Sequence, residues 1–336
     1  MLQTENRLSG VMRSFDIALI MTLLNEEKDL PGLLESIDSQ TLRPDEVVIC
    51  DSGSSDATMQ IINSWRDSCP LKVTIIEKPG LNIAQGRNLA INAVDSSIIS
   101  VTDGSCVLQK DWLQEITRPM RSNEQTTGIV YGVTVAVGEG RVGHQFAVLH
   151  SLKTNGRELS DSEHSSRSVA FLRSVWDAVG GYPEWMTLAG EDTYFFMQVE
   201  KISGSSCAQD AKAYWHHGEE SLVKVFQRHK RNSLGDGEAH LAPLRYLCLL
   251  GIYLAAVIGL FLSILSPVLL PLPLMLLIAV CFRLTPSVLR ARLIQIDTFT
   301  ILPAITLLRD LGMVTGYITG LKRSLSKRLS GHSVGT

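Results

Sequence analysis

The stretch FDIALIMTLL, residues 15–24, is an apolar run of strand length, and residues 25–27, NEE, follow it directly. Such a run is typical of a strand that is buried on both faces of a parallel sheet. The apolar residues that come next share one face of a predicted amphipathic helix: Leu30, Leu33, Leu34 and Ile37. The folded part of the chain therefore begins with a strand followed by a helix.

The same unit recurs three more times. Further strands are predicted at 46–50, 72–77 and 98–102, and further helices at 57–66, 83–94 and 111–120. This alternation predicts an α/β domain in which helices cover a mostly parallel sheet. Ligands of such sheets bind outside the carboxyl ends of the strands. Asn25, Asp51 and Asp103 each follow a predicted strand, so we expect them to meet at one edge of the sheet.

Beyond residue 123 the pattern changes. The sequence predicts a longer strand at 128–137, a loop or lid at 138–166 with a short helix at 146–152, a strand at 167–172 and a helix at 173–179. Two adjacent carboxylates, Glu191 and Asp192, then follow Gly190 and open a predicted helix that ends near residue 201. A strand at 212–215 ends in His216 and His217, and a basic amphipathic helix covers 222–232, which we interpret as a membrane-surface face.

The net charge of −3 conceals an acidic part and a basic part. Residues 243–336 hold nine Lys or Arg and two Asp, which gives +7, so the first 242 residues carry −10. An acidic folded part argues against nucleic acid as a partner. Basic residues beside apolar segments favour anionic lipid and the cytoplasmic face of a membrane.

Residues 246–282 contain no charged side chain over 37 positions. As one helix this segment would be about 55 Å long, whereas a hydrocarbon core is about 30 Å thick. Pro267 and Pro271 indicate a break, so we predict two short spans, 247–265 and 268–282, that form a hairpin; a re-entrant pair is the alternative. Residues 293–321 are predicted as an interfacial helix, with a third span as the alternative.

The cysteines and the N-terminus indicate a cytosolic compartment. The six cysteines have no metal-ligand spacing, so we expect reduced thiols. Residues 1–14 are polar and lack the apolar core of a signal peptide. We therefore expect the folded domain to lie in the cytoplasm, at the inner membrane.

Several short motifs together resemble the family-two glycosyltransferases, which have the GT-A fold, a Rossmann-like sheet that binds a nucleotide-sugar. The matching strings are Asn25-Glu26, Asp51-Ser52-Gly53-Ser54-Ser55-Asp56, Gly86-Arg87-Asn88, Asp103-Gly104-Ser105, Asp111-Trp112-Leu113 and Gly190-Glu191-Asp192. Their order and spacing match over about residues 15–235, and the C-terminal apolar segments resemble a bacterial membrane-associated subgroup of the family.

The resemblance implies a role for each matching residue. The residues implied to bind the nucleotide-sugar are Thr22, Asn25, Glu26, Asp51, Gly53, Arg87, Asp103 and Arg167. Asp192 is implied to be the catalytic base, with Glu191 orienting it or binding the acceptor. The implied ligands of a divalent metal, Mg²⁺ or Mn²⁺, are Asp103, Ser105, His216 and His217. Without the resemblance, Asp51 and Asp56 could equally be turn and cap residues, and Trp215 a core residue.

One motif departs from the family pattern. The family's Asp-x-Asp is Asp103-Gly104-Ser105 here, so its second carboxylate is missing, and a hydroxyl is a poorer ligand for a hard cation. The bacterial membrane-associated subgroup has Asp-Ala-Gly in place of Asp-x-Asp. That subgroup also has a stretch similar to residues 165–171 of this chain. Metal binding is therefore expected through Asp103, the donor's diphosphate and a histidine.

These roles fit the chemistry of sugar transfer. A carboxylate takes the proton of the acceptor hydroxyl, the anomeric carbon gains oxocarbenium character, and a metal or Arg neutralises the leaving diphosphate. A single base opposite the diphosphate, Asp192, predicts inversion of configuration.

We therefore expect four parts: a polar tail at 1–14, a GT-A domain at 15–242, a transmembrane hairpin at 243–282, and a basic interfacial or third membrane segment with a tail at 283–336. The predicted function is transfer of single sugars from a nucleotide-diphosphate-sugar to a lipid-linked glycan or polysaccharide acceptor at the bilayer. The alternative is a non-catalytic GT-A module that scaffolds a membrane polysaccharide assembly.

Overall fold

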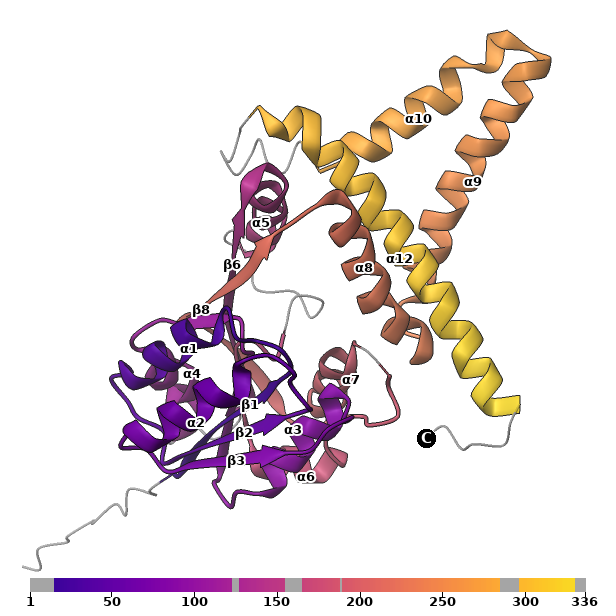
Figure 1. The fold of residues 1–336 in the computed structure, drawn as a ribbon. Helices are drawn as coiled ribbons and strands as arrows, with labels where there is room; N and C mark the ends of the chain where they lie inside the picture. The colour runs from indigo at the N-terminus through magenta and orange to yellow at the C-terminus, as the bar shows by residue number, and fades with distance from the viewer. Residues whose placement is uncertain (1–14, 123–126, 155–164, 188, 285–295, 330–336) are drawn as a thin grey trace, which may run out of the picture.

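The computed structural model describes residues 15–122, 127–154, 165–187, 189–284 and 296–329. They form an α/β domain joined to a set of long C-terminal helices (Figure 1). The predictions for the tail at 1–14, for the part of the lid at 155–164, and for 285–295 and 330–336 lie outside the described residues.

The α/β domain contains an eight-stranded sheet. Its strands are β1 (Ile17–Leu23), β2 (Glu46–Asp51), β3 (Val73–Glu77), β4 (Ile98–Val101), β5 (Cys106–Leu108), β6 (Thr127–Glu139), β7 (Val169–Leu172) and β8 (Gly204–Glu219). The strand order is β3-β2-β1-β4-β7-β6-β8-β5. The first four are parallel, β7 and β5 run antiparallel to their neighbours, and β6 and β8 are parallel to each other.

Helices cover both faces of the sheet. They are α1 (Leu30–Asp38), α2 (Thr58–Ser68), α3 (Ile83–Asn92), α4 (Trp112–Arg121), α5 (Gly140–Thr154), α6 (Arg173–Val179) and α7 (Glu191–Val199). In β1, Leu19 packs into the core beneath α1, α2 and α4, while Ile20 packs beneath α3, α6 and α7. Both faces of β1 are therefore buried, which explains why its sequence is apolar throughout rather than alternating.

The four predicted strand–helix units are confirmed within two residues at nearly every end. In the parallel register, Leu23 at the end of β1 faces Asp51 at the end of β2, and Ile20 faces Val101 at the end of β4. The carboxyl ends of these strands thus lie along one edge of the sheet, as the sequence predicts. That edge is where the polar residues of the candidate site gather.

Two of the later strands, β6 and β8, are longer than predicted. The strand predicted at 212–215 is the middle of β8, which runs for 16 residues beside the 13 residues of β6, with shifts of register along the pair. The segment predicted as a loop with a short helix contains α5, which follows β6 directly. Residues 204–210 are largely polar, so no local pattern indicated a strand; its hydrogen-bond partners in β6 are distant in sequence.

The C-terminal helices are α8 (Leu222–Glu238), α9 (Pro243–Leu265), the short 3₁₀ helix η2 (Pro267–Leu269), α10 (Pro271–Phe282) and α12 (Asp297–Leu329). Helix α12 packs lengthwise on α8 (Figure 1). Its glycines at positions 312, 316 and 320 face the α8 backbone; a Cβ on Gly316 would lie 2.1 Å from the carbonyl oxygen of Lys230. Glycine is therefore required for this close approach.

Helices α9 and α10 form an apolar hairpin that projects away from the α/β domain (Figure 1). Its two ends rest on α12: the ring of Tyr246 stacks on Tyr317 at 4.0 Å, and Arg283 donates to Asp310 at 2.6 Å. With 23 residues α9 is about 35 Å long, enough to cross a bilayer, whereas the 12 residues of α10 reach about 18 Å.

By length and composition, two helices of the described chain could cross a membrane: Pro243–Leu265 and Asp297–Lys327. The two helices differ in burial. In an apolar 18-residue stretch of each helix, 11% is buried in the first helix and 50% in the second. The break predicted at the prolines is confirmed, since η2 separates α9 from α10.

Candidate active site

A cleft of about 860 Å³ opens at the carboxyl edge of the sheet. Its walls come from the ends of β1 and β4, the start of α3, the start of α7, the end of β8 and one face of α8. The predicted site residues that line it are Thr22, Glu26, Arg87, Asp103, Ser105, Arg167, Glu191 and Asp192. The structure therefore brings together residues that the sequence separates by as many as 170 positions.

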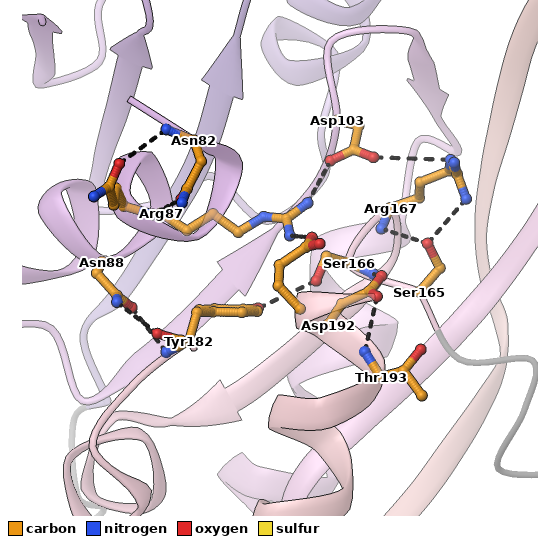
Figure 2. A network of polar contacts seen from close by, with 12 residues as sticks. Asn82, Arg87, Asn88, Asp103, Ser165, Ser166, Arg167, Tyr182, Asp192 and Thr193 are labelled. Carbon is orange, nitrogen blue, oxygen red and sulfur yellow. Dashed lines mark hydrogen bonds and ion pairs between the residues drawn. The ribbon is translucent and has the colours of Figure 1, made fainter. Parts of the chain in front are cut away.

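Arg87 on α3 connects the two acidic ends of this cleft (Figure 2). Its Nη2 donates to Asp103 Oδ1 at 3.0 Å and its Nη1 donates to Glu191 Oε1 at 2.5 Å, while its side chain is 2% exposed. A capping box between Asn82 and Gln85 fixes the start of α3 and so the position of Arg87. Both terminal nitrogens of Arg87 are thus engaged by protein carboxylates, and the side chain also lines the cleft. Its role in binding the donor stays a prediction.

The two acids at the start of α7 have different surroundings. Glu191 is buried against Arg87, and burial, together with the charge of Asp192, raises the pKa of Glu191 while Arg87 opposes that rise. Asp192 is half-buried and borders the cleft. Its Oδ1 accepts from the backbone N–H of Thr193 at 2.8 Å and its Oδ2 from that of Ser166 at 3.3 Å (Figure 2). Two backbone donors thus hold the Asp192 carboxylate at the cleft surface.

At the opposite end, Asp103 and Glu26 lie close together. Gly104 permits this, because a Cβ there would be 2.8 Å from Glu26 Cγ. Burial, and then the charge of Asp103, raises the pKa of Glu26 to about 7. On its other side, Asp103 Oδ2 lies 3.8 Å from Arg167 Nε. This end of the cleft therefore holds two neighbouring carboxyl groups that a cation would stabilise.

The oxygen atoms present suit a hard divalent ion that shares its coordination with phosphate. Mg²⁺ is usually held by one or two protein carboxylates, with the substrate's phosphates and water completing the shell. Asp103, Ser105 and Glu26 offer oxygens at one place in the cleft. Within the described ranges, no group of three or more His, Cys, Asp or Glu could hold a metal by itself.

The two predicted histidine ligands do not line the cleft. His217 is enclosed by aromatic rings, with ring centroids 4.9 Å from Phe146 and 5.2 Å from Trp215, and its Nδ1 lies 3.6 Å from Glu220. The backbone N–H of His216 donates to the carbonyl oxygen of Ser105 at 2.8 Å. The long β8 strand carries both residues past the cleft, so the structure does not group them with Asp103.

Three further predicted residues shape the edge of the cleft instead of lining it. Asp51 is fully buried, and its Oδ1 accepts from the backbone N–H groups of Gly53 and Ser54 at 2.9 and 2.8 Å. Asn25 has a positive φ of 57°, and its Oδ1 accepts from the backbone N–H of Ser55 at 2.8 Å. The contacts of Asp51 are those of an Asx turn, the alternative that the sequence left open, whereas the contact of Asn25 joins the segment after β1 to a residue 30 positions away.

One face of α8 was not predicted as part of the site. Arg228, Arg231, Asn232 and Asp236 line the cleft, at a spacing that places them on one side of a helix. Trp215 also lines the cleft, with the guanidinium of Arg167 4.0 Å and that of Arg228 5.1 Å from its ring centroid. The sequence indicated a basic amphipathic helix here, and the spacing of its arginines was the available signal.

Comparison with known proteins places this arrangement in a family. Residues 18–180 match the model of glycosyl transferase family 2. The O-antigen chain rhamnosyltransferase RfbN of Salmonella typhimurium strain LT2 is 26% identical over 227 residues, which cover 63% of this chain and 70% of RfbN. The poly(ribitol-phosphate) β-N-acetylglucosaminyltransferase TarS of Staphylococcus aureus is 28% identical over 100 residues, 29% of this chain and 18% of TarS.

The fold has a solved counterpart. The mannosyltransferase PcManGT from Pyrobaculum calidifontis, solved with GDP-Man and Mn²⁺, aligns with a TM-score of 0.55 and 18% identity over 90% of this chain and 89% of that one. At this identity the likeness shows the fold alone. Together with the family match, it bears out the predicted GT-A architecture. Residues 18–180 therefore match glycosyl transferase family 2, and the α/β domain that contains them has the GT-A fold.

Proposed function

We propose that this protein is an inverting glycosyltransferase that moves a sugar from a nucleoside-diphosphate-sugar to a membrane-associated acceptor. One observation carries the proposal: the Asp192 carboxylate borders the same cleft as Asp103, and Arg87 connects the two ends through Asp103 and Glu191. Direct transfer between two substrates requires that the base and the diphosphate-binding residues lie in the same cleft.

In this proposal the donor lies at the strand edge. Thr22, Ser52 and Asn82 border the cleft beside β1, β2 and α3, and the turn held by Asp51 shapes this side. Arg167 is the cation next to Asp103 that faces the cleft, with its side chain 27% exposed. It would neutralise charge that develops on the leaving diphosphate.

A divalent ion, when bound through Asp103, Ser105 and Glu26, would supply Lewis-acid stabilisation of the diphosphate oxygens. The likeness to PcManGT, solved with Mn²⁺, supports this assignment. The rest of the reaction depends on side chains of the chain itself.

Asp192 would accept the proton of the acceptor hydroxyl as that oxygen attacks the anomeric carbon. The bond between that carbon and the diphosphate breaks on the opposite side, so the configuration inverts. Glu191 remains with Arg87, so it would position Asp192 and leave the proton transfer to that residue.

The acceptor is proposed to be a lipid-linked glycan or polysaccharide at the cytoplasmic face of the inner membrane. The exposed apolar hairpin of α9 and α10, with Arg245 and Arg283 at its ends, supports a bilayer next to the cleft. The names of RfbN and TarS, which concern O-antigen chains and poly(ribitol-phosphate), support an envelope polymer as the product.

The test begins with calorimetric titration of the detergent-purified chain with UDP, GDP, CDP and dTDP, with and without Mn²⁺. Transfer of labelled sugar from the matching donor into a membrane lipid extract is then measured for the wild type, Asp192→Asn and the control Asp210→Asn, an exposed acid of β8. We expect Asp192→Asn to reduce transfer about 10²–10⁴-fold without loss of nucleotide binding, since a general base contributes about that much.

Other results would count against the proposal. Failure to bind any of the four nucleotides would overturn a transferase. Nucleotide binding without transfer by the wild type would favour the non-catalytic scaffold, for which the missing second carboxylate at Ser105 is the supporting observation.

A further inference from the structure

Three cations gather at the α8 end of the cleft. Arg167, Arg228 and Arg231 all border the cleft there, and the first two stack against Trp215. Burial lowers the pKa of the Arg228 guanidinium, and the charges of Arg167 and Arg231 act in the same direction because the three cations lie close together.

The carboxylates nearby pair with two of these three cations. Arg228 is paired with the buried Glu220, and Arg167 lies near Asp103. Arg231 is exposed at the cleft, and among the described residues it has no ion-pair partner. An anionic group of a substrate would therefore complete the set.

The position of these arginines along α8, relative to the base of the hairpin, indicates which substrate would carry the anionic group. On α12, Asp310 and Tyr317 anchor the two ends of the hairpin, and Gly312 and Gly316 lie between them. Those glycines contact α8 at Phe226 and Lys230. Arg228 and Arg231 are therefore level with the base of the hairpin, where lipid head groups would lie if α9 enters a bilayer.

The same face of α8 leads toward the catalytic base. Asn232 and Asp236 continue the cleft lining one and two turns beyond Arg228, and Asp236 accepts a hydrogen bond from Tyr246 in the first turn of α9. Gly235, on this stretch, abuts the backbone of Ala189 just before Glu191 and Asp192. One face of α8 thus extends from Arg228 to Gly235, which contacts the chain just before Asp192.

We infer that Arg228 and Arg231, with Arg167, bind the phosphate of a lipid-linked acceptor, so that the acceptor is a glycan joined to its lipid through a phosphate or diphosphate. This inference rests on the proposed transferase function and specifies its second substrate. The phosphate lies at the head-group level of α8, and the acceptor's hydroxyl reaches along Asn232 and Asp236 to Asp192.

The test titrates the detergent-purified full chain with farnesyl diphosphate, with farnesol and with inorganic pyrophosphate. The variant is Arg231→Gln, because Arg231 is exposed and its replacement leaves the buried Arg228–Glu220 pair intact. The control is Lys230→Gln, which removes one charge from the same helix at a position that does not line the cleft. We expect farnesyl diphosphate to bind and farnesol not to bind. We expect Arg231→Gln, but not Lys230→Gln, to lower the affinity for farnesyl diphosphate about tenfold or more.

Three results would overturn the inference. Equal affinity of wild type and Arg231→Gln for farnesyl diphosphate would remove Arg231 from the site. A variant that loses affinity for the nucleoside diphosphate instead would assign the cations to the donor. Pyrophosphate binding as tight as farnesyl diphosphate, with both weakened in the variant, would indicate a free-phosphate site. Nucleotide titration of the same samples tests the transferase function separately.

Discussion

Arg87 Nη1 and Glu191 Oε1 lie 2.5 Å apart between two buried side chains that the sequence separates by 104 positions. The pair fixes the start of α7 against α3, and Asp192 follows Glu191 directly. A buried ion pair at the wall of the cleft can thus decide where the base lies.

Arg87→Met is expected to lower the free energy of unfolding by about 3–5 kcal/mol, because it leaves the carboxylate of Glu191 buried without its partner. Chemical denaturation measures this change. Arg66→Met, which removes an exposed arginine paired with its neighbour Asp67, is the control and should change stability by about 0–1 kcal/mol. Equal effects of the two variants would refute a structural role for Arg87.

Stability should fall as pH rises from about 4.5 to about 7. The pKa of Glu26 is raised from 4.5 to about 7, so the folded state holds a proton that the unfolded state releases across this window. Glu26→Gln should reduce this fall, which thermal unfolding at a series of pH values would detect. Glu35→Gln, at an exposed position of α1, should leave the profile as in the wild type, and an unchanged profile for Glu26→Gln would contradict the assignment.

Gly316→Ala should loosen α12 from α8. Its Cβ would lie 2.1 Å from the carbonyl oxygen of Lys230, so the helices must move apart, at a cost of about 1–3 kcal/mol in unfolding free energy. Gly251→Ala on α9 is the matched control, because a Cβ there meets nothing within 4 Å. If the two variants melt at the same temperature, the close helix contact is not maintained in solution.

The tip of the hairpin should determine membrane association. Val268 and Leu272 are 86% and 68% exposed, and replacing both with Lys should release the chain from liposomes in a flotation assay. Each charge has to pass through the hydrocarbon core as the tip inserts, where a Lys costs about 2.5–3.5 kcal/mol. Ile202→Lys, at an exposed apolar position of the α/β domain, should float like the wild type; a tip variant that does the same would argue against insertion of the hairpin.

The first half of the fold could be predicted because its signals are local. Each of the first four strands is an apolar run, each is followed by an amphipathic helix, and their predicted bounds lie close to those of β1 to α4. The pairing of β6 with β8 could not be predicted in this way. Its hydrogen bonds join segments about 80 residues apart, and the early part of β8 is polar.

Many of the residues that line the site were predicted, and their roles stay predictions. The motif residues identified Asp103 and Asp192, and both border the cleft. A motif does not say which side chains a buried residue contacts, so the enclosure of Arg87 and the use of Asp51 in a turn were visible only in three dimensions. The cleft face of α8 was missed because its arginines were interpreted as facing lipid.

The glycine contact between α8 and α12 has a consequence for substrate choice. It joins the wall of the cleft to the base of the hairpin so closely that the two cannot slide past each other. If the hairpin is embedded in a bilayer, Asp192 is held at a constant height above it. The protein would then select acceptors by the distance between their lipid anchor and the reacting hydroxyl. A glycan lengthened by one product sugar would no longer place its hydroxyl at Asp192.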